Sequence, residues 1–190
     1  LLLFLATAAL FWPATGFEFL NYDDDAYVTA NALVRAGLDG ESVRAAFTSG
    51  AAANWHPLTW LSHQLDVELF ELDAGAHHRT SVLLHALNAA LVFLALRALT
   101  ERAGASALVA ALFAFHPLRV ESVAWVAERK DLLAGTFFAA TLWAHARWVR
   151  TRRRGAYVAT LVLLTLGLMA KPMLVTLPAV LFVLDLWPLA

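Results

Sequence analysis

Residues 81–98 read SVLLHALNAALVFLALRA, an almost unbroken apolar run whose one charged residue, Arg97, lies next to its end. A run of this length and composition is typical of a helix that crosses a lipid bilayer. His85 and Asn88 lie inside the run, where polar side chains are costly and usually face other helices. The stretch therefore predicts a membrane-spanning helix packed within a helical bundle.

Further apolar stretches flank this run on both sides. The chain of 190 residues is 61% hydrophobic and 15% charged, whereas soluble domains are about 25% charged. We therefore predict an all-α protein, a polytopic transmembrane bundle of about six spans. A long first external loop, at about residues 16–80, is expected to hold surface helices near 26–36 and 58–70. The other predicted spans are residues 1–11, 106–115, 132–149, 157–170 and 173–187.

The composition also excludes some classes of function. A net charge of −1 gives no reason to expect a nucleic-acid partner, and the absence of cysteine excludes disulfides and thiolate metal sites. The chain begins without Met and stops soon after Trp187-Pro188. We therefore expect it to be the N-terminal part of a longer membrane protein.

Basic residues predict how the chain is oriented. Five arginines and no acid lie within residues 147–154, which places this loop in the cytoplasm by the positive-inside rule. By alternation, the first loop, the segment 116–131 and the Lys171-Pro172 turn face outward. An inner bacterial membrane, with the functional end toward the periplasm, fits this arrangement.

Two of the predicted spans are too short to cross a bilayer. The stretch 105–116 would form about 18 Å of helix, compared with a hydrocarbon core of about 30 Å. Irregular backbone at membrane depth is tolerated where it lines a cavity. We therefore expect an outward-facing cavity, with His116-Pro117 and Lys171-Pro172 near its floor.

An acidic run, Asp23-Asp24-Asp25, follows Tyr22 near the start of the first loop. Adjacent carboxylates repel one another and are costly to remove from water, so the cluster needs a compensating role. One interpretation is a cap for a helix that begins at Ala26. The other is chemistry, as a general base or a metal ligand. The residues alone leave both open.

Histidines mark two further segments. The stretch 54–60 contains His56 between Trp55 and Trp60, with His63 seven residues after His56. The tryptophans suit a helix at the membrane interface, whereas the role of His56 stays open.

The second histidine segment lies at the start of the central run. His78, His85 and Asn88 share one helix face by their spacing. For Asn88 we favour a hydrogen bond between helices. A zinc site is the alternative, but no His-Glu-x-x-His pattern supports it.

The segment 116–131 combines acids and bases, including His116, Glu121, Arg129 and Lys130. A solvated helix with internal salt bridges would explain it. The functional interpretation is an anion site, in which Arg129 and Lys130 hold a lipid-linked phosphate.

Lys171 lies between two apolar stretches, where a lysine either is functional or extends to the membrane surface. The convergence of carboxylates, bases and histidines on the outward side favours an enzyme that acts on a phosphate-bearing lipid. It also suits a transporter or flippase of an anionic lipid or solute. A third possibility is a scaffold whose polar residues only pack.

Short polar motifs follow one another in a characteristic order: Tyr22-Asp23-Asp24 with Asn31, His56-Pro57-Leu58-Thr59, His78 with His85, Phe115-His116-Pro117 with Glu121, Arg129, Asp131-Leu132-Leu133, and Ala170-Lys171. In this order and spacing, the chain resembles the membrane-embedded GT-C glycosyltransferases over nearly its whole length. It is most similar to the TMTC (transmembrane and tetratricopeptide-repeat containing) proteins and their bacterial relatives.

The resemblance implies transfer of a sugar from a polyprenyl-phosphate donor to a protein or glycan acceptor on the extracytoplasmic face. It implies an inverting reaction with a catalytic pair, Asp23 and Asp24, in which one Asp is the base. It implies no required cofactor and leaves a divalent metal open. The family's further spans and its tetratricopeptide repeats are expected outside these 190 residues. Our expected substrate-binding residues are His56, His78, His116, Glu121, Arg129, Lys130 and Lys171.

Overall fold

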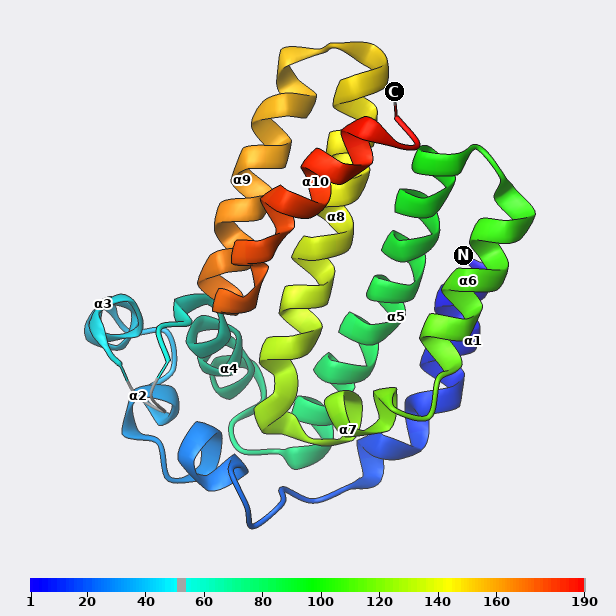
Figure 1. The fold of residues 1–190 in the computed structure, drawn as a ribbon. Helices are drawn as coiled ribbons and strands as arrows, with labels where there is room; N and C mark the ends of the chain where they lie inside the picture. Colours follow the sequence, from blue (N-terminus) through cyan, green and yellow to red (C-terminus); the bar gives the residue numbers. More distant parts are fainter. Residues whose placement is uncertain (51–53, 190) are drawn as a thin grey trace.

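The computed structural model describes residues 1–50 and 54–189, and every regular element in this part of the chain is helical (Figure 1). The all-α prediction is therefore confirmed. The elements, with η for short 3₁₀ or π turns, are α1 (Leu2–Phe11), η1 (Trp12–Gly16), η2 (Asp25–Thr29), α2 (Ala32–Arg35), α3 (Gly40–Thr48), α4 (Pro57–Phe70), α5 (Ala74–Thr100), α6 (Ala103–Phe115), α7 (Arg119–Ala124), η4 (Val126–Glu128), α8 (Arg129–Thr151), α9 (Arg154–Ala170), η5 (Pro172–Thr176) and α10 (Leu177–Leu186).

Helix α5 lies at the centre of the bundle and packs against α1, α6 and α8, while α9 packs against the other side of α8. Small side chains permit this close packing, since Ala86 and Ala89 on α5 are fully buried. Gly135 on α8 faces Asn88, and a Cβ at Gly135 would lie 3.0 Å from the side-chain nitrogen of Asn88. A larger residue at position 135 would therefore push the two helices apart.

Polar side chains of α5 connect it to its neighbours. Asn88 donates to the carbonyl of Leu132 at 2.9 Å and accepts from the hydroxyl of Thr136 at 2.6 Å, both on α8. A ring nitrogen of His85 lies 2.9 Å from the carbonyl of Ala114 on α6. The expected helix–helix hydrogen bond of Asn88 is confirmed, and His85 forms a similar one.

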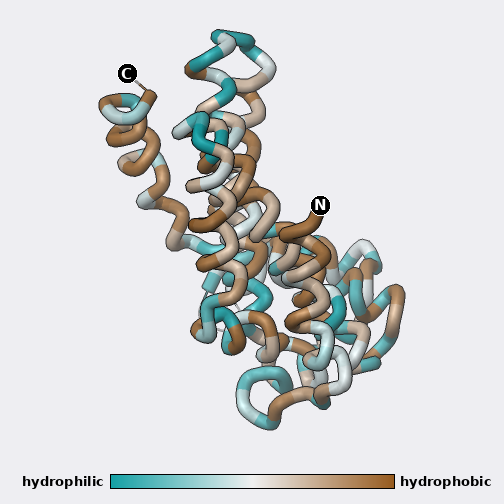
Figure 2. The backbone as a smooth tube through the Cα atoms, turned by 90° about the vertical axis from the view of Figure 1, so that its right-hand side faces the viewer, coloured by the Kyte–Doolittle hydropathy of each residue, from teal (hydrophilic) through white to brown (hydrophobic). Residues whose placement is uncertain are grey.

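The connections lie at the ends that alternation predicts. Figure 1 shows the α5–α6 and α8–α9 turns at one end of the bundle, and α2, α3, α4 and α7 at the opposite end. Figure 2 shows hydrophilic residues at the α8–α9 turn and in the loops of the opposite end, with hydrophobic residues along much of α10. The arginine-rich turn and the acidic first loop are therefore far apart.

Only one helix within residues 1–50 and 54–189, α5, is both long and apolar enough to cross a membrane by itself. Shorter apolar helical segments are Leu2–Gly16, Ala103–Phe115, Arg154–Ala170 and Pro172–Leu186. Helix α8 has 23 residues, but charged residues in its first and last turns shorten its apolar part. The number of membrane spans therefore stays a prediction.

Two predicted helices are interrupted. The segment 26–36 divides into η2 and α2 because Asn31 has an extended backbone and caps α2, accepting from the amide of Leu33 at 3.0 Å. The segment 118–131 breaks at Trp125, whose backbone is extended between α7 and η4. A solvated helix that runs unbroken through the segment 116–131 is therefore wrong.

The first loop has its own small core. Tyr27, Val28 and Val34 pack with Trp60 of α4 and with Val126 of η4. Trp60 is fully buried, so its predicted place at the membrane interface is wrong. This core holds the first loop against the turn that leads into α8.

Candidate functional site

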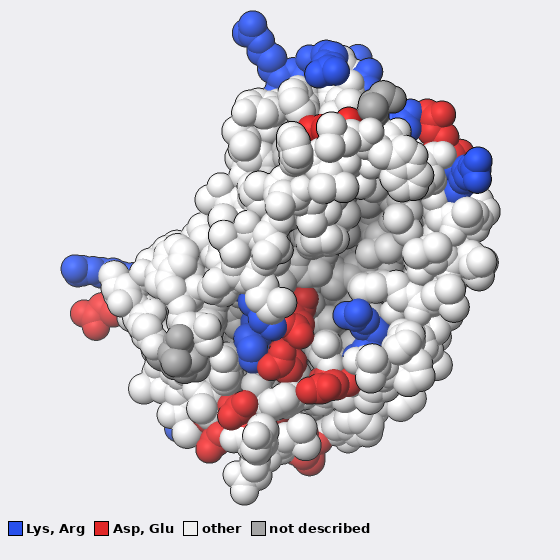
Figure 3. All heavy atoms as spheres, viewed as in Figure 1, with Lys and Arg blue, Asp and Glu red and all other residues white. Residues whose placement is uncertain are grey.

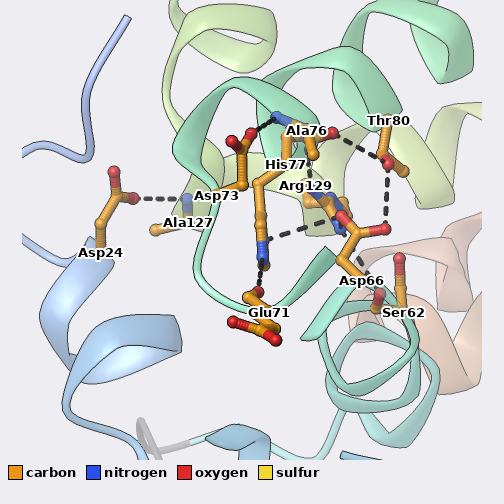
Figure 4. A network of polar contacts seen from close by, with 10 residues as sticks. All are labelled: Asp24, Ser62, Asp66, Glu71, Asp73, Ala76, His77, Thr80, Ala127 and Arg129. Carbon is orange, nitrogen blue, oxygen red and sulfur yellow. Dashed lines mark hydrogen bonds and ion pairs between the residues drawn. The ribbon is translucent and has the colours of Figure 1, made fainter. Parts of the chain in front are cut away.

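The acidic run contains three carboxylates in three different environments. Asp24 is fully buried. One of its oxygens accepts from the amide of Leu20 and the other from the amide of Ala127, each at 2.8 Å. Asp24 thus fastens the first loop to η4, immediately before α8 (Figure 4).

The two neighbours of Asp24 are more accessible. Asp23 is half-buried, and its carboxylate makes no hydrogen bond or ion pair with any residue in the described part of the chain. Asp25 is exposed and accepts from the amide of Ala26 at 2.8 Å as η2 begins. Asp24 is fixed by its two backbone contacts and thereby holds the adjacent Asp23 in place. Of the three carboxylates, Asp23 is therefore the one that is both held in place and available to a ligand.

Arg129 lies in a buried network at the start of α8 (Figure 4). Its side chain is fully buried and pairs with Asp66 of α4. It also donates to the carbonyl of His77 at 2.7 Å. Asp66 accepts in addition from the hydroxyl of Thr80 at 2.9 Å.

This network gives Arg129 a structural position that the sequence did not predict. The guanidinium connects α4, α5 and α8 and has no exposed surface. A phosphate could reach it only by displacing Asp66, which would leave a buried carboxylate unpaired. Its contacts with α4 and α5 instead hold the first turn of α8 in place, and with it the neighbouring residues Lys130 and Asp131.

Lys130 and Lys171 are two of the partly exposed cations at this end of the bundle. The Nζ of Lys130 lies 2.7 Å from Glu128 and 4.5 Å above the ring of Tyr27. Lys171, which follows α9, pairs with Asp131 of α8. Figure 3 shows acidic and basic side chains together in a hollow over the lower part of α8 and α7.

His56 lies near both lysines. It is buried, and its ring stacks on the ring of Tyr27 and contacts that of Trp60, with ring centroids 5.9 Å and 4.7 Å apart, respectively. Burial, reinforced by the positive charges of Lys130 and Lys171, lowers the pKa of His56 to about 4. The imidazole is therefore neutral near pH 7, and its Nε2 has no hydrogen-bond partner among the described residues.

The remaining predicted site residues are more dispersed. His78 on α5 is buried and lies 3.4 Å from the carbonyl of Glu18 in the first loop. His116 is exposed and accepts from the amide of Leu118 at 3.2 Å. Glu121 is exposed on α7.

We predicted a single outward-facing cavity with both His116 and Lys171 near its floor, and the structure shows that this is wrong. Lys171 lines a cavity of about 250 Å³ together with Asp131 and Phe138. His116 and Pro117 line a different cavity of about 380 Å³, against α1 and η1. The two cavities share no lining residue, so His116 and Lys171 lie in separate places.

The structure does bring together Lys130, Lys171 and His56. Asp23 is next to Asp24 in the sequence and four residues before Tyr27, whose ring lies under Lys130.

Two residues of the site, Asp66 and Tyr27, were missed from the sequence, and His63 was noted without a role. Asp66 carries no local signal, because its partner Arg129 is distant along the chain. Tyr27 could have been found, since it is an aromatic residue two positions after the acidic run. His63 is fully buried, and neither ring nitrogen has a hydrogen-bond partner in the described residues. Burial and the nearby charge of Arg129 lower its pKa well below the usual value.

Within residues 1–50 and 54–189, no three side chains of His, Asp or Glu are grouped so that they could hold a metal ion. The histidines 78 and 85 instead contact backbone carbonyls.

Known proteins resemble this chain in sequence. A family model described as dolichyl-phosphate-mannose-protein mannosyltransferase matches residues 57–188. Protein O-mannosyl-transferase Tmtc2 of Drosophila melanogaster is 33% identical over 172 residues, which cover 82% of this chain and 18% of that protein. Tmtc1 of the same organism is 30% identical over 128 residues, covering 67% of this chain and 15% of that protein. Human protein O-mannosyl-transferase TMTC3 is 32% identical over 94 residues, covering 50% of this chain and 10% of that protein.

The family match begins at the first residue of α4 and ends at Pro188, one residue before the end of the described chain. It includes Arg129, Lys130 and Lys171, so the network and the lysine pair lie inside the shared region. The chain spans less than a fifth of the length of these relatives. No solved structure matches it. The resemblance to TMTC-like proteins is thereby confirmed, and the chain belongs to the dolichyl-phosphate-mannose-protein mannosyltransferase family.

Proposed function

We propose that the chain forms part of a membrane glycosyltransferase that moves a sugar from a polyprenyl-phosphate carrier to a protein acceptor. The observation that carries this proposal is the grouping of Lys130, Lys171 and neutral His56 beside the acidic run, within a chain that belongs to a mannosyltransferase family. The names of the relatives favour mannose as the sugar and an oxygen of a protein as the acceptor.

The proposed membrane arrangement is a multi-pass bundle of about six spans. The arginine-rich α8–α9 turn then faces the cytoplasm, and the first loop faces the opposite side. In a bacterium this is the inner membrane, with the site toward the periplasm. Short helices such as α6 and α9 would be accommodated by local thinning of the bilayer and by the loops packed against their ends.

The donor phosphate is proposed to bind between Lys130 and Lys171. Both ammonium groups are partly exposed, and each already has one carboxylate partner, Glu128 or Asp131. A phosphate can accept charge-assisted hydrogen bonds from both lysines without removing them from their partners. His56 contributes a neutral N–H donor at the same place.

The two aspartates have separate roles in this proposal. Asp24 positions the loop through its two backbone contacts, and Asp23 acts as the general base. The acceptor oxygen forms a bond to the anomeric carbon from the face opposite the phosphate, and its proton passes to Asp23. The bond between the anomeric carbon and the phosphate oxygen breaks, and its electron pair leaves with the polyprenyl phosphate. The anomeric configuration is thereby inverted.

The test uses the full-length protein in membranes, a polyprenyl-phosphate sugar and a peptide acceptor. Asp23→Asn should reduce transfer by at least about a hundredfold, as expected for loss of a general base, with an unchanged melting temperature. Asp25→Asn, the matched control, should retain transfer. Normal transfer by Asp23→Asn would exclude the base assignment. Solute or lipid flux without any covalent product would indicate the transporter instead.

A further inference from the structure

A groove of about 380 Å³ lies between α8 and α9, at the end of the bundle far from the proposed site. It belongs to none of the features described so far. The residues that line it include Trp143, Arg147, Arg153, Ala156, Ala159 and Leu163.

Helical spacing explains why this groove exists. Trp143, Arg147 and Thr151 recur every fourth residue on one face of α8. Ala156 and Ala159 lie on the facing side of α9, where their short side chains leave the space unfilled. The groove therefore has an apolar wall on α9 and a wall on α8 that changes from aromatic to basic toward the turn.

The mouth of the groove carries unneutralised positive charge. Among the five arginines of residues 147–154, only Arg150 has a carboxylate partner in the described chain, namely Glu101. Arg147 lies over the ring of Trp143 at 5.2 Å, and Arg153 is exposed. Figure 3 shows basic side chains gathered at the α8–α9 end of the molecule.

The groove offers few hydrogen-bonding groups below its mouth. The hydroxyl of Thr151 already donates to the carbonyl of Arg147 at 2.7 Å. Below this level the walls are Ala156, Ala159 and Leu163, beside the Trp143 ring. A sugar, a nucleotide base or a free phosphate would find no further partners there, whereas an acyl chain would bury apolar surface.

We propose that this groove binds an anionic phospholipid of the cytoplasmic leaflet. The phosphate lies between Arg147 and Arg153, and an acyl chain runs along Ala156, Ala159 and Leu163. Trp143 then lies at the boundary between headgroup and chain, a position that tryptophan favours. Anionic lipids are enriched where basic residues flank a membrane helix. The inference rests on the proposed membrane topology but not on the sugar-transfer activity.

The experiment measures lipid retention by native mass spectrometry on the full-length protein in detergent. Phosphatidylglycerol and phosphatidylcholine of equal chain length are added in parallel, and no sugar donor is present. The wild type should retain phosphatidylglycerol preferentially. The double variant Arg147→Gln with Arg153→Gln should lower that retention roughly tenfold, because both phosphate contacts are lost.

The matched control is Arg152→Gln with Arg154→Gln, which removes the same charge from the same turn but leaves the groove residues in place. It should retain the lipid. An equal loss in both double variants, or no loss in either, would overturn the inference. Displacement of the lipid by millimolar inorganic phosphate would likewise overturn it, because it would identify a simple anion site.

A second variant tests the apolar part. Ala159→Phe fills the groove without changing any charge and should lower phosphatidylglycerol retention while the melting temperature in pure detergent stays within a few degrees. Unchanged retention would exclude an acyl chain in the groove. Because retention is read without sugar donor, failure of the lipid site and failure of the transferase give different results.

Discussion

At the scale of single residues, the carboxylate of Asp24 joins parts of the chain that are distant in sequence. It accepts from the amides of Leu20 and Ala127 and is fully buried. A carboxylate in this position is satisfied by backbone donors and has little left to offer a substrate. Asp23, next to it, is half-buried and has no partner in the described chain.

Replacing Asp24 should affect stability first. Asp24→Ala leaves two amides without their acceptor and should lower the free energy of unfolding by about 2–3 kcal/mol. Asp23→Ala, the matched control, should change it by less than about 0.5 kcal/mol. Thermal unfolding of the purified full-length variants measures both. Equal melting temperatures for the two variants would contradict the separation of roles.

Because Arg129 and Asp66 form a buried ion pair, we expect the effects of substituting them on the free energy of unfolding to be non-additive. Asp66→Leu leaves the guanidinium unpaired in the protein interior and should cost about 3–5 kcal/mol. The double variant Asp66→Leu with Arg129→Met removes both charges and should be more stable than either single variant. A double-mutant cycle in urea measures the coupling, and simple additivity would argue against a buried pair.

His56 predicts a dependence of stability on pH. Its folded-state pKa of about 4 is below the unfolded value of about 6.5, so the unfolded chain binds more protons between these values. The contribution of His56 is therefore fully present above about pH 6.5 and is lost as the pH falls toward 4. His56→Gln should reduce the slope of melting temperature against pH between 4.5 and 6.5. A slope unchanged by the substitution would contradict the proposed environment.

At the scale of elements, α5 organises the bundle because it contributes both small side chains and polar contacts. Ala86 and Ala89 let neighbouring helices approach, and Asn88 fixes their register against α8. Periodicity predicted where these helices lie, but short elements depended on local backbone chemistry. The break at Asn31 and the turn at Trp125 follow from capping and extended backbone, which hydrophobic patterns do not report.

The α5–α8 contact can be tested at Asn88. Asn88→Leu removes two hydrogen bonds and leaves the hydroxyl of Thr136 with only its own helix carbonyl, Leu132. Stability should fall by about 1–2 kcal/mol, within the range of polar contacts between membrane helices. Leu87→Ala on the exposed side of α5 serves as the control and should have a smaller effect. Thermal unfolding in detergent makes the comparison.

At the scale of the whole molecule, charge and helical arrangement agree. Residues 147–154, at the α8–α9 turn, hold five arginines and no acid, and the opposite end carries the acidic first loop and the lysine pair together with further arginines (Figures 1 and 3). This polarity is the basis for the proposed orientation across a membrane.

The absence of cysteine in these 190 residues permits a direct test of orientation. In a full-length protein cleared of any other cysteine, Glu121→Cys should react with a membrane-impermeant maleimide on intact cells. Arg154→Cys should react only after the membrane is permeabilised. Labelling of both positions on intact cells would contradict the proposed topology.

The sequence by itself determined the all-α class, the family and the order of the charged motifs, because apolar periodicity and short motifs are local properties of the chain. It also pointed to Asp23, Asp24, Lys130 and Lys171. Only the tertiary structure decided that Asp24 and Arg129 are buried, that Arg129 pairs with Asp66, and that His56 lies near both lysines. The physical reason is that burial and ion pairing depend on residues far apart in the chain. No local pattern of residues specifies which distant side chain will balance a charge.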